Sequence, residues 1–284
     1  MAVVATGFFD GVHLGHRQVI QTLVSSARQR GEEAIAVTFA QHPRAVLQQD
    51  ARFLRLLNSP QEKEALLLGL GVDRVETLPF DRAFARLTAA DYIRDVLRDR
   101  LGATCLILGY DNRLGSDRLT PDTIIPLAEK LGLEVEVVPA STSNDAVISS
   151  TKIREALEEG SVEAAEAMLG YPYMLRGLVV GGKQLGRTLG FPTANLRLYD
   201  PMKLVPARGV YLTEVEVLGS HYWGMTNVGD IIETHIFDFS EDIYGHDLEI
   251  RFRRWLREMR TMENLDALKT QLAADAAACR EMLR

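Results

Sequence analysis

Apolar and polar positions follow two different periods along the first half of the chain. Short apolar, β-branched runs indicate strands, and between them lie longer segments in which apolar residues recur every three or four positions, as in helices. The expected strands cover 2–9, 34–39, 74–80, 104–109 and 133–139, and the expected helices cover 15–29, 61–70, 89–100 and 121–131. This alternation implies βαβ units and a parallel sheet, which would bind ligands beyond the carboxyl ends of its strands.

The pattern changes near residue 160. Helical spacing continues to Leu169, and the run GYPY at 170–173 then interrupts it. Beyond this run the chain has β-rich segments with glycines at their ends, at 175–180, 209–218, 222–228, 233–239 and 248–252. An Ala- and Leu-rich helix over 264–284 follows them. Such spacing predicts a small antiparallel barrel with a closing helix. We therefore expect an α/β domain over 1–160, a linker over 161–173 and a barrel domain over 174–284.

Composition narrows the classes of partner. Two domains suit a chain of 284 residues, and the net charge of −7 provides no basic surface for nucleic acid or an anionic membrane. No apolar run has the length of a membrane span, and the N-terminus lacks the pattern of a signal peptide. Cys105 and Cys279 lie in apolar segments, where buried free thiols are the usual interpretation. These features favour a cytoplasmic protein and leave its oligomeric state open.

A glycine-rich turn joins the first expected strand to the first expected helix. Its sequence from Gly7 to His16 is GFFDGVHLGH. Glycines let the backbone approach a ligand closely, and a helix start offers unpaired N–H groups to phosphate. Two histidines three residues apart, His13 and His16, can bond phosphate oxygens and stabilise charge as pyrophosphate leaves. A lone histidine is usually only a surface or core residue, but this H-x-G-H spacing after a strand favours a nucleotidyl-transfer site.

This turn resembles the N-terminal half of the bacterial bifunctional riboflavin kinase/FMN adenylyltransferases, a branch of the HxGH nucleotidyltransferases. TFAQHPR at 38–44 is similar to the segment "TF-x-PHP" of that family, with Gln41 in place of the usual proline, and ISSTKIR at 148–154 matches its second signature. Hydroxyls and a guanidinium at a helix start can clamp a triphosphate, although S-S-T alone would more often be a helix cap. The resemblance implies catalytic roles for His13, His16, Ser150 and Arg154, and contacts to ATP from Gly7, Phe8, Asp10, Gly15 and Thr151.

The implied reaction is an in-line displacement. The phosphate of FMN attacks the α-phosphorus of ATP, pyrophosphate leaves, and FAD forms. The protein mainly positions the reactants and neutralises charge, so no covalent nucleophile is needed. The same resemblance implies that Asn112 contacts the flavin in this half of the chain.

A second glycine-rich segment lies in the expected barrel. GLVVGGKQLGRTLGFPTANL at 177–196 has no Walker sequence, but a loop of this kind can wrap polyphosphate with backbone donors and positive charge. Alone it would more often be a turn or bulge; the whole run, however, resembles the riboflavin kinase signature "G-x(3)-GR-x-LGFPTAN" without a mismatch. The resemblance implies that Thr193 and Asn195 supply oxygen ligands to Mg²⁺ and that ATP contacts Gly182, Lys183, Arg187 and Pro192.

Further segments of that family follow in order. They are GVY at 209–211, NVG at 227–229, ETHIFDF at 233–239 and DIYG at 242–245. By resemblance, Asn227 contacts flavin and Glu233 takes the proton from the ribityl hydroxyl as it attacks the γ-phosphorus of ATP. A carboxylate at a strand end is otherwise usually only solvated. The expected substrates and products are thus riboflavin, FMN, FAD and ATP.

Two connections are shorter than the family pattern. The pattern "G-x-D-x-RFG" and a further glycine are replaced by the direct run from Arg113 to Leu114-Gly115, and "x-RPT" with its loop is absent between Gly229 and Glu233. Either the chain has lost these loops or the sequence omits segments there, and the intact flanking motifs favour omission. Two alternatives to the bifunctional enzyme stay open: only one activity is retained, or the protein is an inactive flavin-binding protein.

Overall fold

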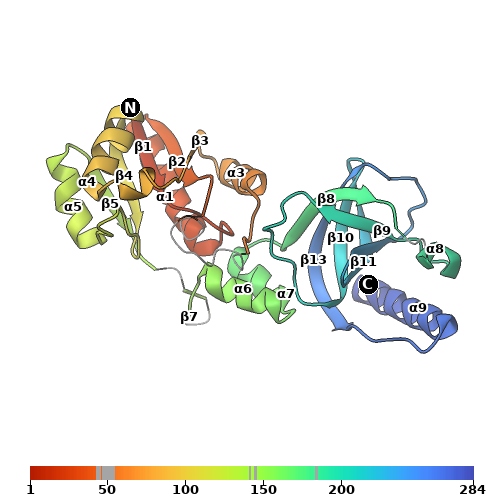
Figure 1. Ribbon diagram of the computed structural model, residues 1–284. Helices are drawn as coiled ribbons and strands as arrows, with labels where there is room; N and C mark the ends of the chain where they lie inside the picture. Colours follow the sequence, from red (N-terminus) through yellow and green to blue (C-terminus); the bar gives the residue numbers. More distant parts are fainter. Residues whose placement is uncertain (43–45, 47–54, 141, 144–145, 183–184) are drawn as a thin grey trace. The chain divides into compact units, whose positions relative to one another are not determined.

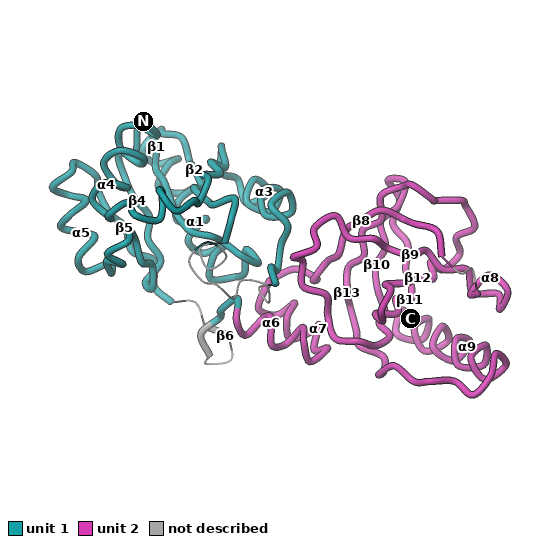
Figure 2. The backbone as a smooth tube through the Cα atoms, viewed as in Figure 1, with its two compact units in different colours: residues 1–150 teal, residues 151–284 magenta. Residues whose placement is uncertain are grey.

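The computed structural model describes residues 1–42, 46, 55–140, 142–143, 146–182 and 185–284. The chain forms two compact units, Met1–Ser150 and Thr151–Arg284, shown as a ribbon in Figure 1 and in separate colours in Figure 2. Each unit has its own sheet, in agreement with the predicted α/β and barrel architectures. Among the described residues, no helix has both the length and the apolar character needed to cross a membrane.

Unit 1 is built on a five-stranded parallel sheet with the order β3-β2-β1-β4-β5. Its strands are β1 (Ala2–Thr6), β2 (Glu33–Phe39), β3 (Arg74–Leu78), β4 (Ala103–Gly109) and β5 (Glu134–Val138). Chain order reverses at the central pair, since β1 lies between β2 and β4. Ligands of such sheets bind beyond the carboxyl ends of the strands at this reversal, which here is the segment after Thr6 and after Gly109.

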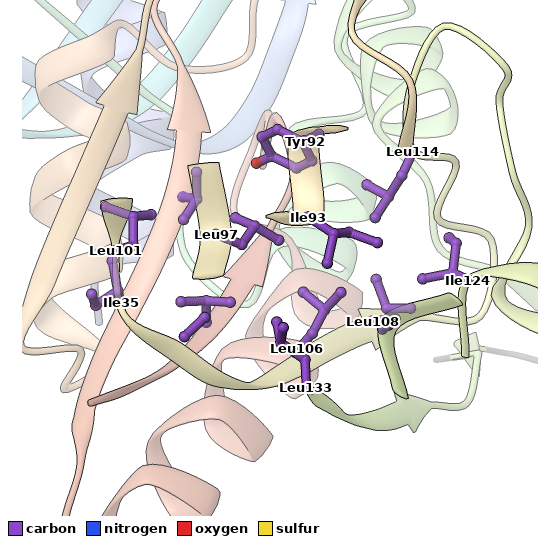
Figure 3. Packing of buried hydrophobic residues seen from close by; sticks show 14 of the residues in the cluster. Ile35, Tyr92, Ile93, Leu97, Leu101, Leu106, Leu108, Leu114, Ile124 and Leu133 are labelled. Atoms are coloured by element: carbon purple, nitrogen blue, oxygen red, sulfur yellow. The ribbon is translucent and has the colours of Figure 1, made fainter. Parts of the chain in front are cut away.

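Helices cover both faces of this sheet. The helical elements of unit 1 are α1 (Leu14–Arg30), α3 (Pro60–Gly69), η2 (Phe84–Arg86), α4 (Ala89–Asp91), η3 (Tyr92–Arg100) and α5 (Pro121–Lys130). Alternate residues of β1 face opposite layers: Val3 packs in the cluster that includes α1, and Val4 packs in the cluster that includes η3. Figure 3 shows the second cluster, in which Ile93 and Leu97 of η3 lie against Leu106 of β4.

The predicted linker at 161–173 contains a helix. α6 covers Ser150–Glu158 and α7 covers Val162–Leu169. Arg253 of the barrel pairs with Glu166 of α7 at 2.6 Å, and a Cβ on Gly160 would lie 2.4 Å from the Trp255 ring. These helices therefore belong with unit 2, and the division falls earlier than residue 160. A short hairpin, β6 (Thr142–Ser143) and β7 (Ala146–Val147), precedes them.

Unit 2 is a closed antiparallel barrel with the order β10-β11-β12-β9-β8-β13. Its elements are β8 (Met174–Val180), α8 (Leu185–Leu189), β9 (Ala194–Leu198), β10 (Gly209–Val217), β11 (Ser220–Val228), β12 (Ile232–Ile236), β13 (Asp247–Glu258) and α9 (Leu265–Met282). β9 is absent from the predicted strands because its residues were interpreted only as a binding motif. Cys279 of the closing helix is buried among Leu212, Met225 and Phe237.

Candidate active sites

The H-x-G-H turn of unit 1 has a strained backbone. It begins directly after β1, and Phe9 and Val12 have φ angles of 53° and 37°, a region in which a β-branched residue such as Val12 is a rare outlier. The side chains of Phe9 and Val12 are buried in the core cluster that includes α1, and this packing holds them in place. Left-handed residues within a turn direct backbone N–H groups into an anion-binding concavity. The turn thus has the geometry of a phosphate site at the carboxyl edge of the sheet.

His13 and His16 form one unit at the start of α1. His13 is the N-cap, and its Nδ1 accepts a hydrogen bond from the His16 backbone N–H at 3.3 Å. Because Nδ1 of His13 accepts, its Nε2 carries the proton in the neutral ring. The two rings stack with centroids 3.6 Å apart. Both imidazoles are therefore fixed relative to the turn, and each can offer one N–H donor to a phosphate oxygen.

Burial keeps both histidines neutral. It lowers the pKa of His13 to about 4, and it holds the pKa of His16 well below the usual value, with further lowering by the charges of His13 and Lys63. Nδ1 of His16 is buried and has no hydrogen-bond partner among the described groups. The turn consequently contains uncharged donors and an unsatisfied ring nitrogen, an arrangement suited to a ligand.

The second signature meets the turn through Ser150. The Ser150 hydroxyl donates to the backbone carbonyl of Asp10 at 2.9 Å, although the two residues are far apart in sequence. Ser150 is the first residue of α6, and Thr151 and Arg154 follow in its first two turns. The structure thus brings Ser150 to the H-x-G-H turn. Thr151 and Arg154 belong to the other compact unit.

Asp10 faces the protein. It is 4% exposed, and one carboxylate oxygen accepts hydrogen bonds from the backbone N–H groups of Leu57 and Asn58, at 2.9 and 3.4 Å. The carbonyl of Phe8 also faces inward, where it accepts from Lys63 Nζ at 3.1 Å. These contacts hold the turn, and the Gly7 N–H adds to them by donating to the Val37 carbonyl at 3.0 Å.

An aromatic pocket of 620 Å³ lies beside the turn at the carboxyl edge of the sheet. Its walls include Thr6, Gly7 and Asn112, and a set of aromatic side chains: Phe8, Phe39, Phe80, Phe84 and Tyr92. The Asn112 amide accepts from Gly109 N at 2.6 Å and donates to the Thr6 carbonyl at 3.1 Å, so it links the ends of β4 and β1. The pocket is mainly apolar, and Arg113, Ser116 and Arg118 also line it, so it can take a ligand that combines a ring system with polar groups.

In unit 2, three predicted site residues form a row across neighbouring strands. Asn195 of β9 pairs with Glu233 of β12, which pairs in turn with Asn227 of β11. With its amide oriented to satisfy both neighbours, Asn195 donates to Glu233 Oε1 at 3.0 Å and accepts from the Gly182 N–H at 3.2 Å. Oδ1 of Asn227 is buried without a hydrogen-bond partner among the described groups. The carboxylate is thus held by an amide on one side and has an unsatisfied acceptor on the other.

A cavity of 410 Å³ lies at the mouth of the barrel. Its walls include Arg187 of α8 and Pro192, two expected ATP contacts, Thr193, an expected Mg²⁺ ligand, and residues 239–244. His235 Nδ1 donates to the Pro192 carbonyl at 2.8 Å and so fixes the segment before Thr193. Lys183 lies outside the described residues, so its predicted contact has no structural counterpart here.

Two family models divide the chain as the structure does. The FAD synthetase model matches residues 1–152, and the riboflavin kinase model matches residues 169–283. The bifunctional riboflavin kinase/FMN adenylyltransferase of Escherichia coli (strain K12) is 36% identical over 98% of this chain and 92% of its own length. The chain belongs to the bifunctional riboflavin kinase/FMN adenylyltransferase family.

Other members agree with this assignment. The riboflavin kinase/FMN adenylyltransferase of Bacillus subtilis is 33% identical over 96% of this chain and 90% of its own length. A crystal structure described as that of a macrolide-efflux protein from Streptococcus pneumoniae is 34% identical, with a TM-score of 0.92 over 98% of this chain and 93% of that one. That protein is named for another activity, but its fold is the same over nearly the whole chain.

Both connections that are short for this family close as tight turns. Leu114 and Leu119 pair in an isolated bridge, and Gly229 N donates to the Ile231 carbonyl at 3.2 Å. Both connections thus join their flanking segments within a few residues.

Several residues that build these sites were not predicted from the sequence. Lys63 lies in the expected helix 61–70, at an inward position in register with Leu67 and Leu70. A lysine at such a position is unusual and is itself a sequence signal of a buried polar contact. Phe80 and Phe84 were assigned to no site, because the pocket they line joins segments far apart in sequence. His235 lay within a matched motif without a stated role.

Proposed function

We propose that each unit carries one of two successive reactions. The barrel unit phosphorylates riboflavin to FMN with ATP, and the parallel-sheet unit adenylylates FMN to FAD with release of pyrophosphate. The observation that carries this proposal is the contrast in chemistry: a carboxylate held by an amide in the barrel, and two neutral imidazoles on a phosphate-binding turn in the other unit.

In the barrel, Glu233 acts as the general base. A ribityl hydroxyl is not ionised at pH 7, so its attack on the γ-phosphorus requires a proton acceptor. The hydrogen bond from Asn195 fixes one carboxylate oxygen and leaves the other to take the proton. ATP occupies the 410 Å³ cavity against Arg187, Pro192 and Thr193, and the family resemblance implies phosphate contacts from Gly182 and from Lys183, which lies outside the described residues. The unsatisfied Oδ1 of Asn227 accepts a hydrogen bond from the flavin.

In the parallel-sheet unit, no base is required. A phosphate monoester has a second pKa of about 6, so FMN brings its own ionised nucleophile. The aromatic pocket holds the flavin ring beside Asn112, and the turn at Gly7–Gly15 receives the ATP phosphates. His13 and His16 donate hydrogen bonds as charge develops on the leaving pyrophosphate, and Ser150 supports the turn through its hydrogen bond to the Asp10 carbonyl.

The donor set beside Glu233 fits Mg²⁺. Thr193 offers a hydroxyl oxygen, Asn195 an amide oxygen with a second lone pair, and Glu233 a carboxylate, all of them the hard ligands this cation prefers. A protein usually supplies only part of the magnesium shell and leaves the rest to phosphates and water. When bound, the ion would neutralise the β- and γ-phosphates, while Thr193 and Asn195 orient them.

The remaining partner assignments belong to the same proposal. Riboflavin, FMN, FAD and ATP are the ligands, and nucleic acid is not one of them, since the net charge is −7. Both free thiols, Cys105 and Cys279, are buried, which accords with a reducing cytoplasm.

A pair of substitutions tests the two-site assignment. Purified protein receives riboflavin, ATP and Mg²⁺, or FMN, ATP and Mg²⁺, and FMN and FAD are followed by chromatography. We expect His16→Ala to abolish FAD formation and to leave FMN formation intact, and Glu233→Ala to do the reverse. Loss of both activities in either folded variant would contradict the assignment. A wild-type protein that makes only one product would support the single-activity alternative, and one that binds flavin without turnover would support the binding-protein alternative.

A further inference from the structure

A buried lysine contacts the back of the H-x-G-H turn. Lys63 lies in the first turn of α3 and is 5% exposed. Its Nζ donates to the carbonyl of Phe8 at 3.1 Å and to the carbonyl of Phe39 at 3.3 Å, and it lies 4.0 Å from the centroid of the Phe8 ring. The ammonium thus joins the turn after β1 to the end of the neighbouring strand β2. Neither of the two proposed reactions gives it a role.

The segment that carries Lys63 holds the turn at a second point. The backbone N–H groups of Leu57 and Asn58 donate to the Asp10 carboxylate. A reciprocal cap between Ser59 and Glu62 fixes the start of α3. Residues 57–63 therefore hold Phe8 and Asp10 in place through hydrogen bonds. Phe9 and Val12 have an unfavourable left-handed backbone, which persists only where contacts from neighbouring residues hold the turn in place.

The charge at Lys63 is not needed for packing. Burial lowers the pKa of Lys63 to about 8, against an opposite effect of Asp10. Taking an ammonium out of water is unfavourable, and the hydrogen bonds to the Phe8 and Phe39 carbonyls offset that cost. A charged group at an otherwise apolar position is commonly found beside a functional site. Here that site is a turn built to receive phosphates.

We propose that Lys63 is a positioning residue for adenylyl transfer: together with the Thr38 hydroxyl it fixes the Phe8 carbonyl, so that the strained turn directs its N–H groups at the nucleotide phosphates, and it alone adds positive potential behind them. This inference rests on the proposed function, in which the turn binds ATP. Lys63 does not touch the substrate; it acts through Phe8. Removing Lys63 should weaken the binding of ATP more than that of FMN, because Lys63 holds the main chain of the turn and is not itself a wall of the aromatic pocket, although Phe8 and Phe39 are.

The test compares Lys63→Met and Lys63→Arg with Lys130→Met. Lys130 is an exposed lysine of α5 in the same unit and serves as the matched control. FMN adenylylation is measured with ATP and FMN varied separately. We expect Lys63→Met to raise the KM for ATP or lower kcat by about 10- to 100-fold in total, with the KM for FMN changed less than about threefold. Riboflavin phosphorylation in the same samples should match wild type. Lys130→Met should match wild type in both reactions.

A pH profile separates positioning by charge from mere filling of space. Among the described groups, Asp10 on the turn and His16 on α1 interact electrostatically with Lys63; His13 stacks on His16, His42 lies against Phe8, and Glu62 precedes Lys63 on α3. Carboxyl and imidazole groups titrate below pH 8 as classes, so an alkaline limb near pH 8 reports the ammonium. We expect kcat/KM for ATP in wild type to fall as the pH rises through about 8, and Lys63→Arg, which stays charged, to retain activity above that pH.

Three outcomes overturn the inference: Lys63→Met with wild-type adenylylation kinetics, an equal loss of affinity for ATP and FMN, or the same alkaline limb in wild type and Lys63→Arg. If Lys63→Met does not fold, as judged by circular dichroism, the comparison of wild type with Lys63→Arg decides alone. A wild-type protein that makes no FAD from FMN and ATP would instead remove the proposed function, so the two failures are distinguishable.

Discussion

The two units bind phosphate with opposite kinds of backbone. Unit 1 uses a strained, buried turn between a parallel strand and a long helix, with Phe9 and Val12 at positive φ and histidine rings stacked behind it. Unit 2 uses a glycine segment and a short helix at the mouth of a barrel, and its charged group, Glu233, projects from a strand. The first site is made by fixing main chain, and the second by spacing side chains along adjacent strands.

This difference follows from what each nucleophile requires. The phosphate of FMN is ionised at neutral pH, so the first site needs only donors, and burial supplies neutral imidazoles. The hydroxyl of riboflavin must lose a proton, so the second site needs a base. The same chain thus uses desolvation in one unit and a hydrogen-bonded carboxylate in the other. Substitutions that break one half of this contrast should leave the other half intact.

The largest effect is expected from Gly182→Ala in the barrel. A Cβ there would lie 1.7 Å from the atom of the Asn195 amide that faces Gly182, so this amide must shift and its hydrogen bond to Glu233 is disturbed. Displacing a group that orients the base by about 1 Å can reduce the rate about 100-fold. We expect that loss in riboflavin phosphorylation, measured as FMN formed per minute, with FMN adenylylation unchanged.

The adjacent glycine supplies the control for this change. A Cβ on Gly181 would meet no atom within 4 Å. Gly181→Ala makes the same chemical change one residue earlier in the loop and should leave riboflavin phosphorylation within about twofold of wild type, since exposed substitutions away from such contacts have small effects. Equal losses in both variants would mean that loop flexibility, and not the Asn195–Glu233 pair, controls the rate.

The next effect is a difference in acid stability between the units. The pKa of His13 is lowered to about 4 in the folded state, so between pH 6.5 and 4 the unfolded chain binds the extra proton. Stability of unit 1 therefore falls as the pH drops, by about 2 kcal/mol from His13 at pH 5, and His16 acts in the same direction. In calorimetry, we expect the unit 1 transition to shift downward by about 4–8 °C between pH 7.5 and 5.

His13→Asn is the matched variant for the acid shift. Asparagine is a favourable N-cap, so α1 keeps its start while the titrating ring is removed. The acid shift of unit 1 should become smaller in this variant, and the unit 2 transition should not respond to the substitution. An undiminished shift would place the acid sensitivity elsewhere in unit 1.

Much of this architecture follows from local patterning. The strands and helices of unit 1 are where apolar periodicity predicts them, because each packs one regular face against its neighbour. Periodicity does not predict β9, because Ala194–Leu198 forms a strand only through its pairing with β8 and β12. The helix in the predicted linker depends likewise on barrel contacts, such as Glu166 with Arg253. Elements that need distant partners are the ones that periodicity misses.

The sites divide in the same way. Motif residues such as His13, His16 and Glu233 could be named from the sequence, because the chemistry and spacing are local. The inward orientation of Asp10 could not, since it depends on N–H groups of Leu57 and Asn58 far along the chain. The aromatic pocket combines residues from Thr6 to Arg118 and has no local signature.

That pocket gives the smallest of the expected effects. Phe84 lines it and contacts Phe39, Phe80 and Tyr92 edge-on or tilted, with ring centroids 5.5 to 5.7 Å away. Phe84→Ala removes one aromatic wall, a loss of about 1 kcal/mol, and should raise the KM for FMN in adenylylation about fivefold with kcat little changed. Phe84→Leu keeps apolar volume without the ring, so its KM for FMN should lie between those of wild type and Phe84→Ala. The KM for riboflavin in phosphorylation is the internal reference, because the barrel binds that flavin. A rise in the KM for riboflavin, or an unchanged KM for FMN, would mean that the flavin of unit 1 binds outside this pocket.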